Sequence, residues 1–111
     1  MKITVTNQEA ETFVKSAFEN FPEASQGSSL QCVGWKYADF VFKFVDSETG
    51  KRYTVTLPMA VKAFKKVLKE VGDKKLFIGV DMANILDDGQ WDSVGFDALA
   101  QMAVFGEVIY G

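Results

Sequence analysis

Four aspartates in the C-terminal half of the chain are the side chains whose type and spacing best suit metal binding, namely Asp81, Asp87, Asp88 and Asp92. Carboxylate oxygens are the usual protein ligands of Ca²⁺ and Mg²⁺. A calcium-binding loop also needs oxygen ligands at alternating positions and a closing glutamate, and this stretch has neither. We therefore expect the four aspartates to cap helices and fill turns, and we predict no metal and no cofactor.

Catalytic chemistry is restricted because the chain contains no histidine. This excludes Ser-His-Asp and Cys-His catalysis, zinc sites with histidine ligands, and the usual general base of enzymes at neutral pH. Cys32 is the only cysteine, so it cannot form an internal disulfide, and no base flanks it in the sequence. A free cysteine mostly behaves as a small buried apolar residue. We therefore predict no catalytic residue and no enzymatic activity.

Two short motifs are similar to binding sites but favour a structural explanation. Residues 49–51 (Thr-Gly-Lys) lack the first glycine of a phosphate-binding loop and the Ser or Thr that follows its lysine. Residues 36–42 resemble the aromatic strand of an RNA-recognition domain, but Asp39 stands where a phosphate would approach and the net charge of the chain is -3. We expect the alternating phenylalanines of residues 40–44 to line the inner face of a sheet, and we expect no direct contact with nucleic acid.

A β-hairpin over residues 39–57 is the clearest element that the sequence predicts. Apolar and polar residues alternate on both sides of the turn 46–50, and Gly50 can adopt the positive φ that such a turn requires. Upstream, Gly34 interrupts the alternation. Residues 32–37 are therefore either a bulged extension of the first strand or a separate strand.

The N-terminal residues predict a short strand over residues 2–6 followed by a helix. Thr6 and Glu9 fit a capping box, in which each side chain accepts a hydrogen bond from the other residue's amide. Apolar residues then recur at spacings of three and four, which places them on one helix face. We expect Pro22 to end this helix because proline has no amide hydrogen to donate.

Two further helices follow the hairpin. The first spans roughly residues 58–71, with lysines on its exposed side and Gly72 as a left-handed cap. The second begins after Asp92 and is closed by Gly106. Three shorter segments have weaker signals: residues 76–80 as a buried strand or a turn, residues 81–86 as a short helix capped by Asp81, and residues 108–110 as a strand added to the sheet.

These elements predict one α+β domain over residues 1–111. Its core is a small single-layer, mainly antiparallel sheet with a central β-hairpin, packed by two to four helices. Hydrophobic residues make up 48% of the chain, which is sufficient for a core. No apolar stretch approaches the roughly 20 residues needed to span a membrane, and no signal-peptide core follows Met1. We therefore expect a cytoplasmic protein without membrane contact.

Charge is distributed unevenly along the chain. Residues 62–75 contain six lysines against two acidic residues, whereas residues 76–111 contain six acidic residues and no lysine or arginine. In the simplest explanation, lysines solvate a helix face and aspartates cap helices. In the functional explanation, the acidic stretch docks on a basic groove of a protein partner and competes there with nucleic acid.

The functional explanation predicts a partner-binding site whose residues are Asp87, Asp88, Trp91 and Asp92. Trp91 would anchor the partner, or alternatively would fold back over the edge of the core. Small, acidic, histidine-free domains of this kind resemble the inhibitors and accessory proteins of phages and mobile elements, including some that block nucleic-acid-guided defence complexes.

We therefore expect a small acidic binding protein without catalytic activity. The alternative is a structural or assembly subunit that self-associates through sheet edges or apolar patches, as a homodimer or a larger assembly. Salt separates the two, because acidic docking weakens as salt rises whereas apolar association does not.

Overall fold

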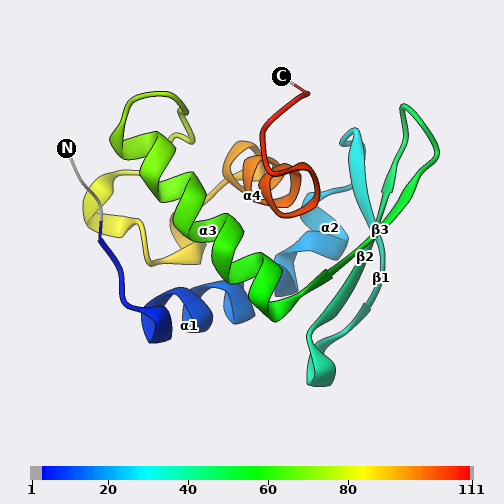
Figure 1. Ribbon diagram of the computed structural model, residues 1–111, viewed down its shortest axis with the longest axis horizontal. Coiled ribbons are helices and arrows are strands. Elements are labelled where there is room, and N and C mark those ends of the chain that lie inside the picture. Colours follow the sequence, from blue (N-terminus) through cyan, green and yellow to red (C-terminus); the bar gives the residue numbers. More distant parts are fainter. Residues whose placement is uncertain (1–3, 111) are drawn as a thin grey trace.

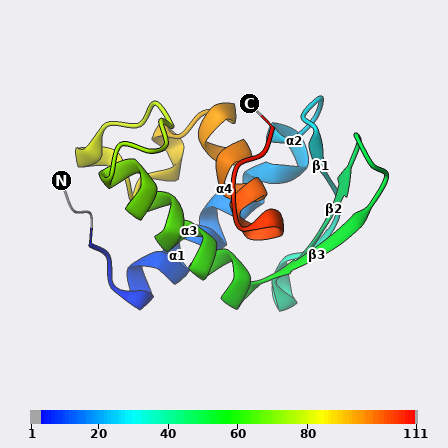
Figure 2. The ribbon, with the colours of Figure 1, turned by 45° about the horizontal axis from the view of Figure 1, so that its top comes forward.

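The computed structural model describes residues 4–110 and measures 37 × 31 × 21 Å along its principal axes. Figure 1 shows a small sheet at one end of the molecule, with the helices packed on one of its faces and extending away from it. Turning the molecule leaves this arrangement unchanged, so the opposite face of the sheet is open (Figure 2). The predicted α+β class with a small antiparallel sheet is confirmed.

Helix α1 spans Asn7–Ala17 and begins at the predicted capping box. Thr6 N donates to Glu9 Oε1 over 2.8 Å, and Glu9 N donates to Thr6 Oγ1 over 3.1 Å. Pro22 does not end the helical region, because the chain continues through a 3₁₀ turn into the short helix α2 (Phe21–Ala24). Pro22 lies in the first turn of α2, where a missing amide hydrogen costs nothing.

The predicted N-terminal strand is only partly testable. Its first two residues lie outside the described part of the chain, and residues 4–6 are not in a strand.

The sheet has three antiparallel strands in the order β1 (Leu30–Lys36), β2 (Val41–Asp46) and β3 (Arg52–Thr56). The hairpin between β2 and β3 is confirmed, and Gly50 has the expected positive φ of 76°. Of the two alternatives for the preceding segment, the separate strand is correct. It pairs with β2 and carries a register shift between Cys32 and Gly34.

The side chains of the sheet divide between two faces. On the inner face, Phe42 and Phe44 of β2 are fully buried, with Val55 and Tyr53 of β3 as their partners. On the outer face, Lys43 lies between Gly34 of β1 and Thr54 of β3. The predicted inner position of the alternating phenylalanines is therefore confirmed.

Helix α3 (Leu57–Gly72) follows β3 directly. The prediction that Gly72 is its left-handed cap is wrong, because Gly72 is buried within the last turn. The left-handed residue is Lys74, with a φ of 60°. The amides of Lys75 and Leu76 then donate to the Glu70 carbonyl at 2.8 and 3.2 Å. The left-handed residue therefore lies two positions after Gly72.

Helix α4 (Ser93–Phe105) begins and ends as the sequence predicts. Asp92 is its N-cap, and Gly106 closes it with a φ of 75°. Every helix within residues 4–110 is too short or too polar to span a lipid bilayer.

The three shorter predicted segments do not form the strands and the helix that the sequence predicts. Residues 76–80 are irregular and form no strand, with Gly79 at a φ of 72°. The short helix after Asp81 is only a 3₁₀ turn, Met82–Asn84. The predicted C-terminal strand is also wrong, because residues 108–110 form no strand and lie against α4. There the side-chain oxygen of Gln101 accepts hydrogen bonds from the amides of Ile109 and Tyr110.

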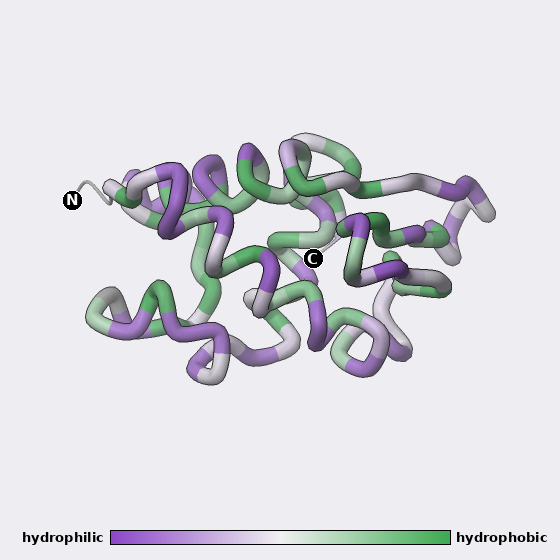
Figure 3. The backbone as a smooth tube through the Cα atoms, turned by 90° about the horizontal axis from the view of Figure 1, so that it is seen from below, coloured by the Kyte–Doolittle hydropathy of each residue, from purple (hydrophilic) through white to green (hydrophobic). Residues whose placement is uncertain are grey.

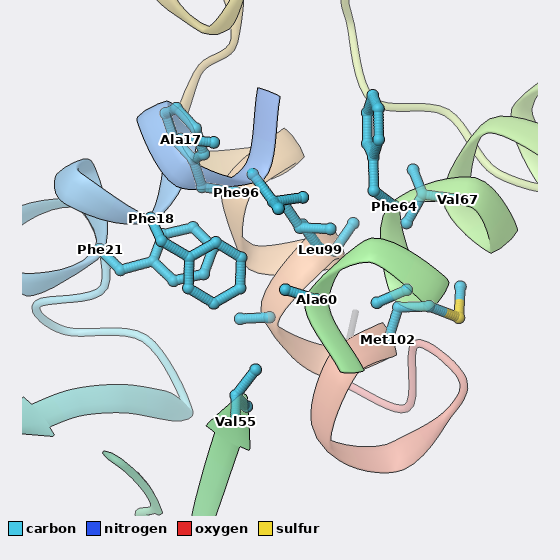
Figure 4. Packing of buried hydrophobic residues seen from close by; sticks show 14 of the residues in the cluster. Ala17, Phe18, Phe21, Val55, Ala60, Phe64, Val67, Phe96, Leu99 and Met102 are labelled. Atoms are coloured by element: carbon cyan, nitrogen blue, oxygen red, sulfur yellow. The ribbon is translucent and has the colours of Figure 1, made fainter. Parts of the chain in front are cut away.

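The core lies between the inner face of the sheet and the helices. Side chains from α3, α4 and the helical segment around Phe18 converge on it in Figure 4. The rings of Phe13 and Phe64 stack with centroids 4.2 Å apart, and Phe18 contacts Phe42 edge to face at 5.0 Å. Hydrophobic and hydrophilic stretches alternate along the backbone in Figure 3, as expected for elements that bury one side.

Candidate functional site: the acidic surface

The irregular segment between α3 and α4 carries the four aspartates that the sequence singles out. We call these residues, Asp81, Asp87, Asp88 and Asp92, the acidic surface. Asp88 is half-buried and the others are exposed. Within residues 4–110, the ion pairs are Glu11–Lys15, Lys36–Asp39 and Lys69–Asp73, so no cation neutralises the acidic surface there.

Three of these carboxylates also accept hydrogen bonds from other residues of the protein. Asp87 Oδ1 accepts from Gly89 N at 3.0 Å, and Asp92 Oδ1 accepts from the amides of Val94 and Gly95 at 3.0 and 3.2 Å. Asp88 Oδ2 accepts from the side-chain amide of Asn20 over 3.2 Å. These bonds fix the carboxylates in place. A carboxylate can accept about four hydrogen bonds, so each of these aspartates keeps acceptor sites that a partner's cations can occupy.

The acidic surface does not form a metal cage. Among the described residues, no three histidine, cysteine or acidic side chains converge in a way that could hold an ion. The carboxylates are spread along the segment, and Asp81, Asp87 and Asp92 are exposed, which suits contact with a broad surface better than coordination of one cation.

Trp91, the predicted anchor, lies in the core. It is only 5% exposed, and its Nε1 donates to the Ile85 carbonyl over 3.1 Å. Its ring lies 5.0 Å from Phe13 and 6.0 Å from Phe64, measured between centroids. Of the two arrangements that the sequence leaves open, the structure has the one in which Trp91 folds back over the core.

Phe77 is the exposed aromatic residue that the sequence does not reveal. It is 85% exposed, the largest fraction among the large hydrophobic residues described. A Cβ at Gly79 would lie 3.9 Å from both Phe77 Cε1 and Asp92 Oδ2, so ring and carboxylate border the same stretch of backbone. Val94, 56% exposed, follows Asp92 by two residues. The acidic surface therefore has an apolar neighbour in Phe77.

A groove adjoins the other end of the acidic surface, between α1 and the segment before α4. Its volume is about 430 Å³, and it is open to solvent. Glu9 and Thr12 of α1 line one side, and Leu86 and Asp88 line the other. Leu86 is 40% exposed, so the groove offers apolar area next to a carboxylate.

Cys32 lies apart from this region, on β1. Its side chain is 8% exposed, and its Sγ lies 3.7 Å from the Gly34 carbonyl oxygen. Burial raises the pKa of the thiol to about 11, and the contact with Gly34 only partly offsets that rise. The thiol is therefore protonated at neutral pH, whereas a cysteine nucleophile reacts as the thiolate.

Comparisons of the chain with protein-family models, with curated proteins and with solved structures gave no match, so no relative supplies a function for the acidic surface.

Proposed function

We propose that this protein binds a basic protein partner through its acidic surface, with Phe77 as the apolar anchor, and that it has no catalytic activity of its own. The observation that supports this most directly is the 85% exposure of Phe77 beside the Asp92 carboxylate. A large apolar side chain that stays in water gains free energy when a partner covers it, about 1.5–3 kcal/mol for complete burial.

The charges and the apolar groups have different tasks in this proposal. Carboxylates without a cation of their own attract a basic surface from a distance and penalise acidic partners, so they contribute association rate and specificity. Phe77, Val94 and Leu86 contribute the apolar contact that slows dissociation. An aromatic residue surrounded by polar groups is a common arrangement at interface hot spots.

The partner we propose is a protein that binds nucleic acid. Such proteins present lysine and arginine grooves to phosphates, and an array of carboxylates occupies the same groove in competition with the nucleic acid. The protein would then act as an inhibitor of the kind used by phages and mobile elements. A cytoplasmic location, where nucleic-acid-guided complexes act, is part of the proposal.

The test is affinity capture from the native host followed by mass spectrometry, with a variant that neutralises three of the four carboxylates of the acidic surface. The variant is Asp87→Asn, Asp88→Asn, Asp92→Asn, because asparagine caps a helix as well as aspartate does and so preserves the turn and α4. The matched control is Glu11→Gln, Asp39→Asn, Asp73→Asn, which removes the same charge from carboxylates already paired with lysines.

We expect a basic protein to be captured by the wild type and by the control, and to be lost with the neutralised variant. Capture by the wild type should fall steeply between about 50 and 200 mM salt. Phe77→Ser should weaken capture without altering its salt dependence. Equal capture by the neutralised variant and the control would show that the interface lies elsewhere.

A further inference from the structure

The outer face of the sheet is a second surface without a partner. Figures 1 and 2 show every helix on the opposite side of the strands. Strand pairing places nine residues on this face: Gln31, Gly34 and Lys36 from β1, Val41, Lys43 and Val45 from β2, and Arg52, Thr54 and Thr56 from β3. The nine include three cations and no acidic residue.

Lys43 stands at the centre of this face. A Cβ at Gly34 would lie 3.7 Å from Lys43 Cβ and 3.8 Å from its Cδ, so the lysine stem passes over the bare glycine backbone. Half-buried Val41 and Val45 flank it along the strand. Within residues 4–110, Lys43 and Arg52 form no ion pair, whereas Lys36 at the rim pairs with Asp39 over 2.9 Å. The outer face is therefore cationic at its centre, with apolar area on both sides.

The acidic surface lies toward the other end of the same molecule. Figure 1 shows the segment between α3 and α4, in yellow, at the end away from the sheet. From residue 76 to the C-terminus the sequence contains no lysine or arginine, and Lys74 and Lys75, which line a pocket with Phe77, mark the boundary of the acidic stretch. The two surfaces therefore have opposite charge, and each has apolar neighbours that can be buried on contact.

We propose that the chain self-associates head to tail, with the acidic surface of one copy seated on the outer face of the sheet of the next copy. The contact joins two different surfaces, so it leaves one of each free at the ends and lets the assembly grow beyond a dimer. A stacked single-stranded nucleic acid fits the outer face less well, because none of its nine residues is aromatic.

This inference rests on the acidic surface of the proposed function but not on the external partner. Because both contacts use the same carboxylates, a basic partner and a second copy would compete for them. High protein concentration would then hold the acidic surface in the assembly, and a tight partner would release it.

The experiment measures molecular mass by sedimentation velocity over a range of concentrations at low salt. The first variant, Lys43→Glu with Arg52→Glu, reverses the charge of the outer face. The second, Asp87→Lys with Asp88→Lys, reverses part of the acidic surface and keeps the Asp92 cap. Lys43→Gln with Arg52→Gln is a milder form of the first variant, and circular dichroism checks the fold of all three.

We expect the mass of the wild type to grow past the dimer as concentration rises, and to fall back to the monomer in high salt. Each charge-reversed variant alone should associate at least about tenfold more weakly, with the glutamine variant in between. A mixture of the two reversed variants at equal concentrations should associate again, because the unchanged acidic surface of the first variant meets the unchanged outer face of the second. At the other contact both faces are reversed in sign and attract each other, so the mixture should also grow past the heterodimer.

Several results would overturn the inference. One is a wild type that stays monomeric at low salt, and another is a mass that stops at the dimer, which indicates a two-fold interface. A third is a folded Lys43→Glu, Arg52→Glu variant that associates like the wild type. If a defined oligonucleotide binds the wild type but not this variant, the outer face is a nucleic-acid site and the inference is wrong. If the wild type stays monomeric while capture still depends on the aspartates, the self-association fails and the proposed function stands.

Discussion

The hydroxyl of Tyr110 donates a hydrogen bond to Asp46 Oδ2 over 2.8 Å, and this contact joins the C-terminal segment to the end of β2. Burial raises the pKa of Asp46, but hydrogen bonds from Tyr110, Glu48 and Thr49 outweigh it and leave the pKa below its ordinary value. The same bond to Asp46, together with burial, raises the pKa of Tyr110 to about 12. This bond is therefore weakened in acid, when Asp46 is protonated, and lost in alkali, when Tyr110 loses its proton.

Tyr110→Phe should make the protein more sensitive to acid. An aspartate with a lowered pKa stabilises the fold above its unfolded pKa, and this contribution is lost as the pH falls through the folded value. Removing the hydroxyl brings the folded pKa of Asp46 closer to the unfolded one, so stability at neutral pH should fall and the midpoint of acid unfolding should move to higher pH. Urea unfolding and a pH titration followed by circular dichroism measure both.

The control for this variant is Tyr53→Phe, because the hydroxyl of Tyr53 makes no hydrogen bond within residues 4–110. It should leave both midpoints nearly unchanged. In the wild type, the contribution of the raised pKa of Tyr110 is complete below its unfolded value, near 10, and is lost as the pH rises through about 12. Equal behaviour of the two variants would contradict this role for the bond.

Gln101→Leu should release the C-terminal segment from α4. Gln101 is fully buried, and its side-chain oxygen accepts from the amides of Ile109 and Tyr110, both at 2.8 Å. Leucine has a similar size but leaves those amides without this acceptor, at a cost of about 1–3 kcal/mol. Hydrogen exchange should become faster at Ile109 and Tyr110 and stay unchanged in the first turns of α1. Unchanged exchange at the two amides would show that Gln101 does not hold them.

Trp91→Ala and Phe77→Ala should differ greatly in their effect on stability, although both remove an aromatic ring. Loss of the buried Trp91 side chain should lower the free energy of unfolding by about 3–5 kcal/mol. Loss of Phe77, which is 85% exposed, should change it by no more than about 0.5 kcal/mol. Chemical denaturation measures both values. A strongly destabilised Phe77 variant would mean that its ring contributes to the core.

Gly95→Ala should destabilise the protein although alanine favours helices. A Cβ at Gly95 would lie 2.7 Å from Trp91 Cε3, which is closer than real side chains approach. Overpacking of this kind costs about 1–3 kcal/mol and outweighs the gain in helix propensity, which is about 1 kcal/mol. Gly34→Ala is the matched control, since its Cβ would make ordinary contacts at 3.7 and 3.8 Å with Lys43. Thermal unfolding of both variants separates close packing from the general effect of replacing a glycine.

Elements set by local interactions are the ones that the sequence predicts correctly. The capping box at Thr6 and Glu9, the Asp92 cap and the turn at Gly50 depend on residues a few positions apart, so their types and spacing are enough. The start of β2 is harder to predict, because Phe40 adopts a left-handed φ of 47° although it is neither glycine nor asparagine. Its ring packs 5.0 Å from both Phe42 and Phe18, and Phe18 is distant in the sequence, so tertiary packing supports the conformation.

The candidate site was harder to predict because it depends on which aromatic residue is buried. Trp91 is surrounded by polar residues in the sequence, but its ring meets Phe13 and Phe64 from two distant helices. Phe77 lies in an apolar run that is typical of a strand, but the segment is irregular, with a positive φ at Gly79, and Phe77 is exposed. The positions of the aspartates could be predicted from the sequence, whereas the apolar neighbour of the acidic surface could not.

Binding through the acidic surface is measured by the amount of basic partner captured at low salt by the wild type and by the Asp87→Asn, Asp88→Asn, Asp92→Asn variant. We expect the variant, still folded, to capture about tenfold less or none, and the control neutralised at Glu11, Asp39 and Asp73 to capture as much as the wild type. Equal capture by all three proteins would contradict binding through the acidic surface.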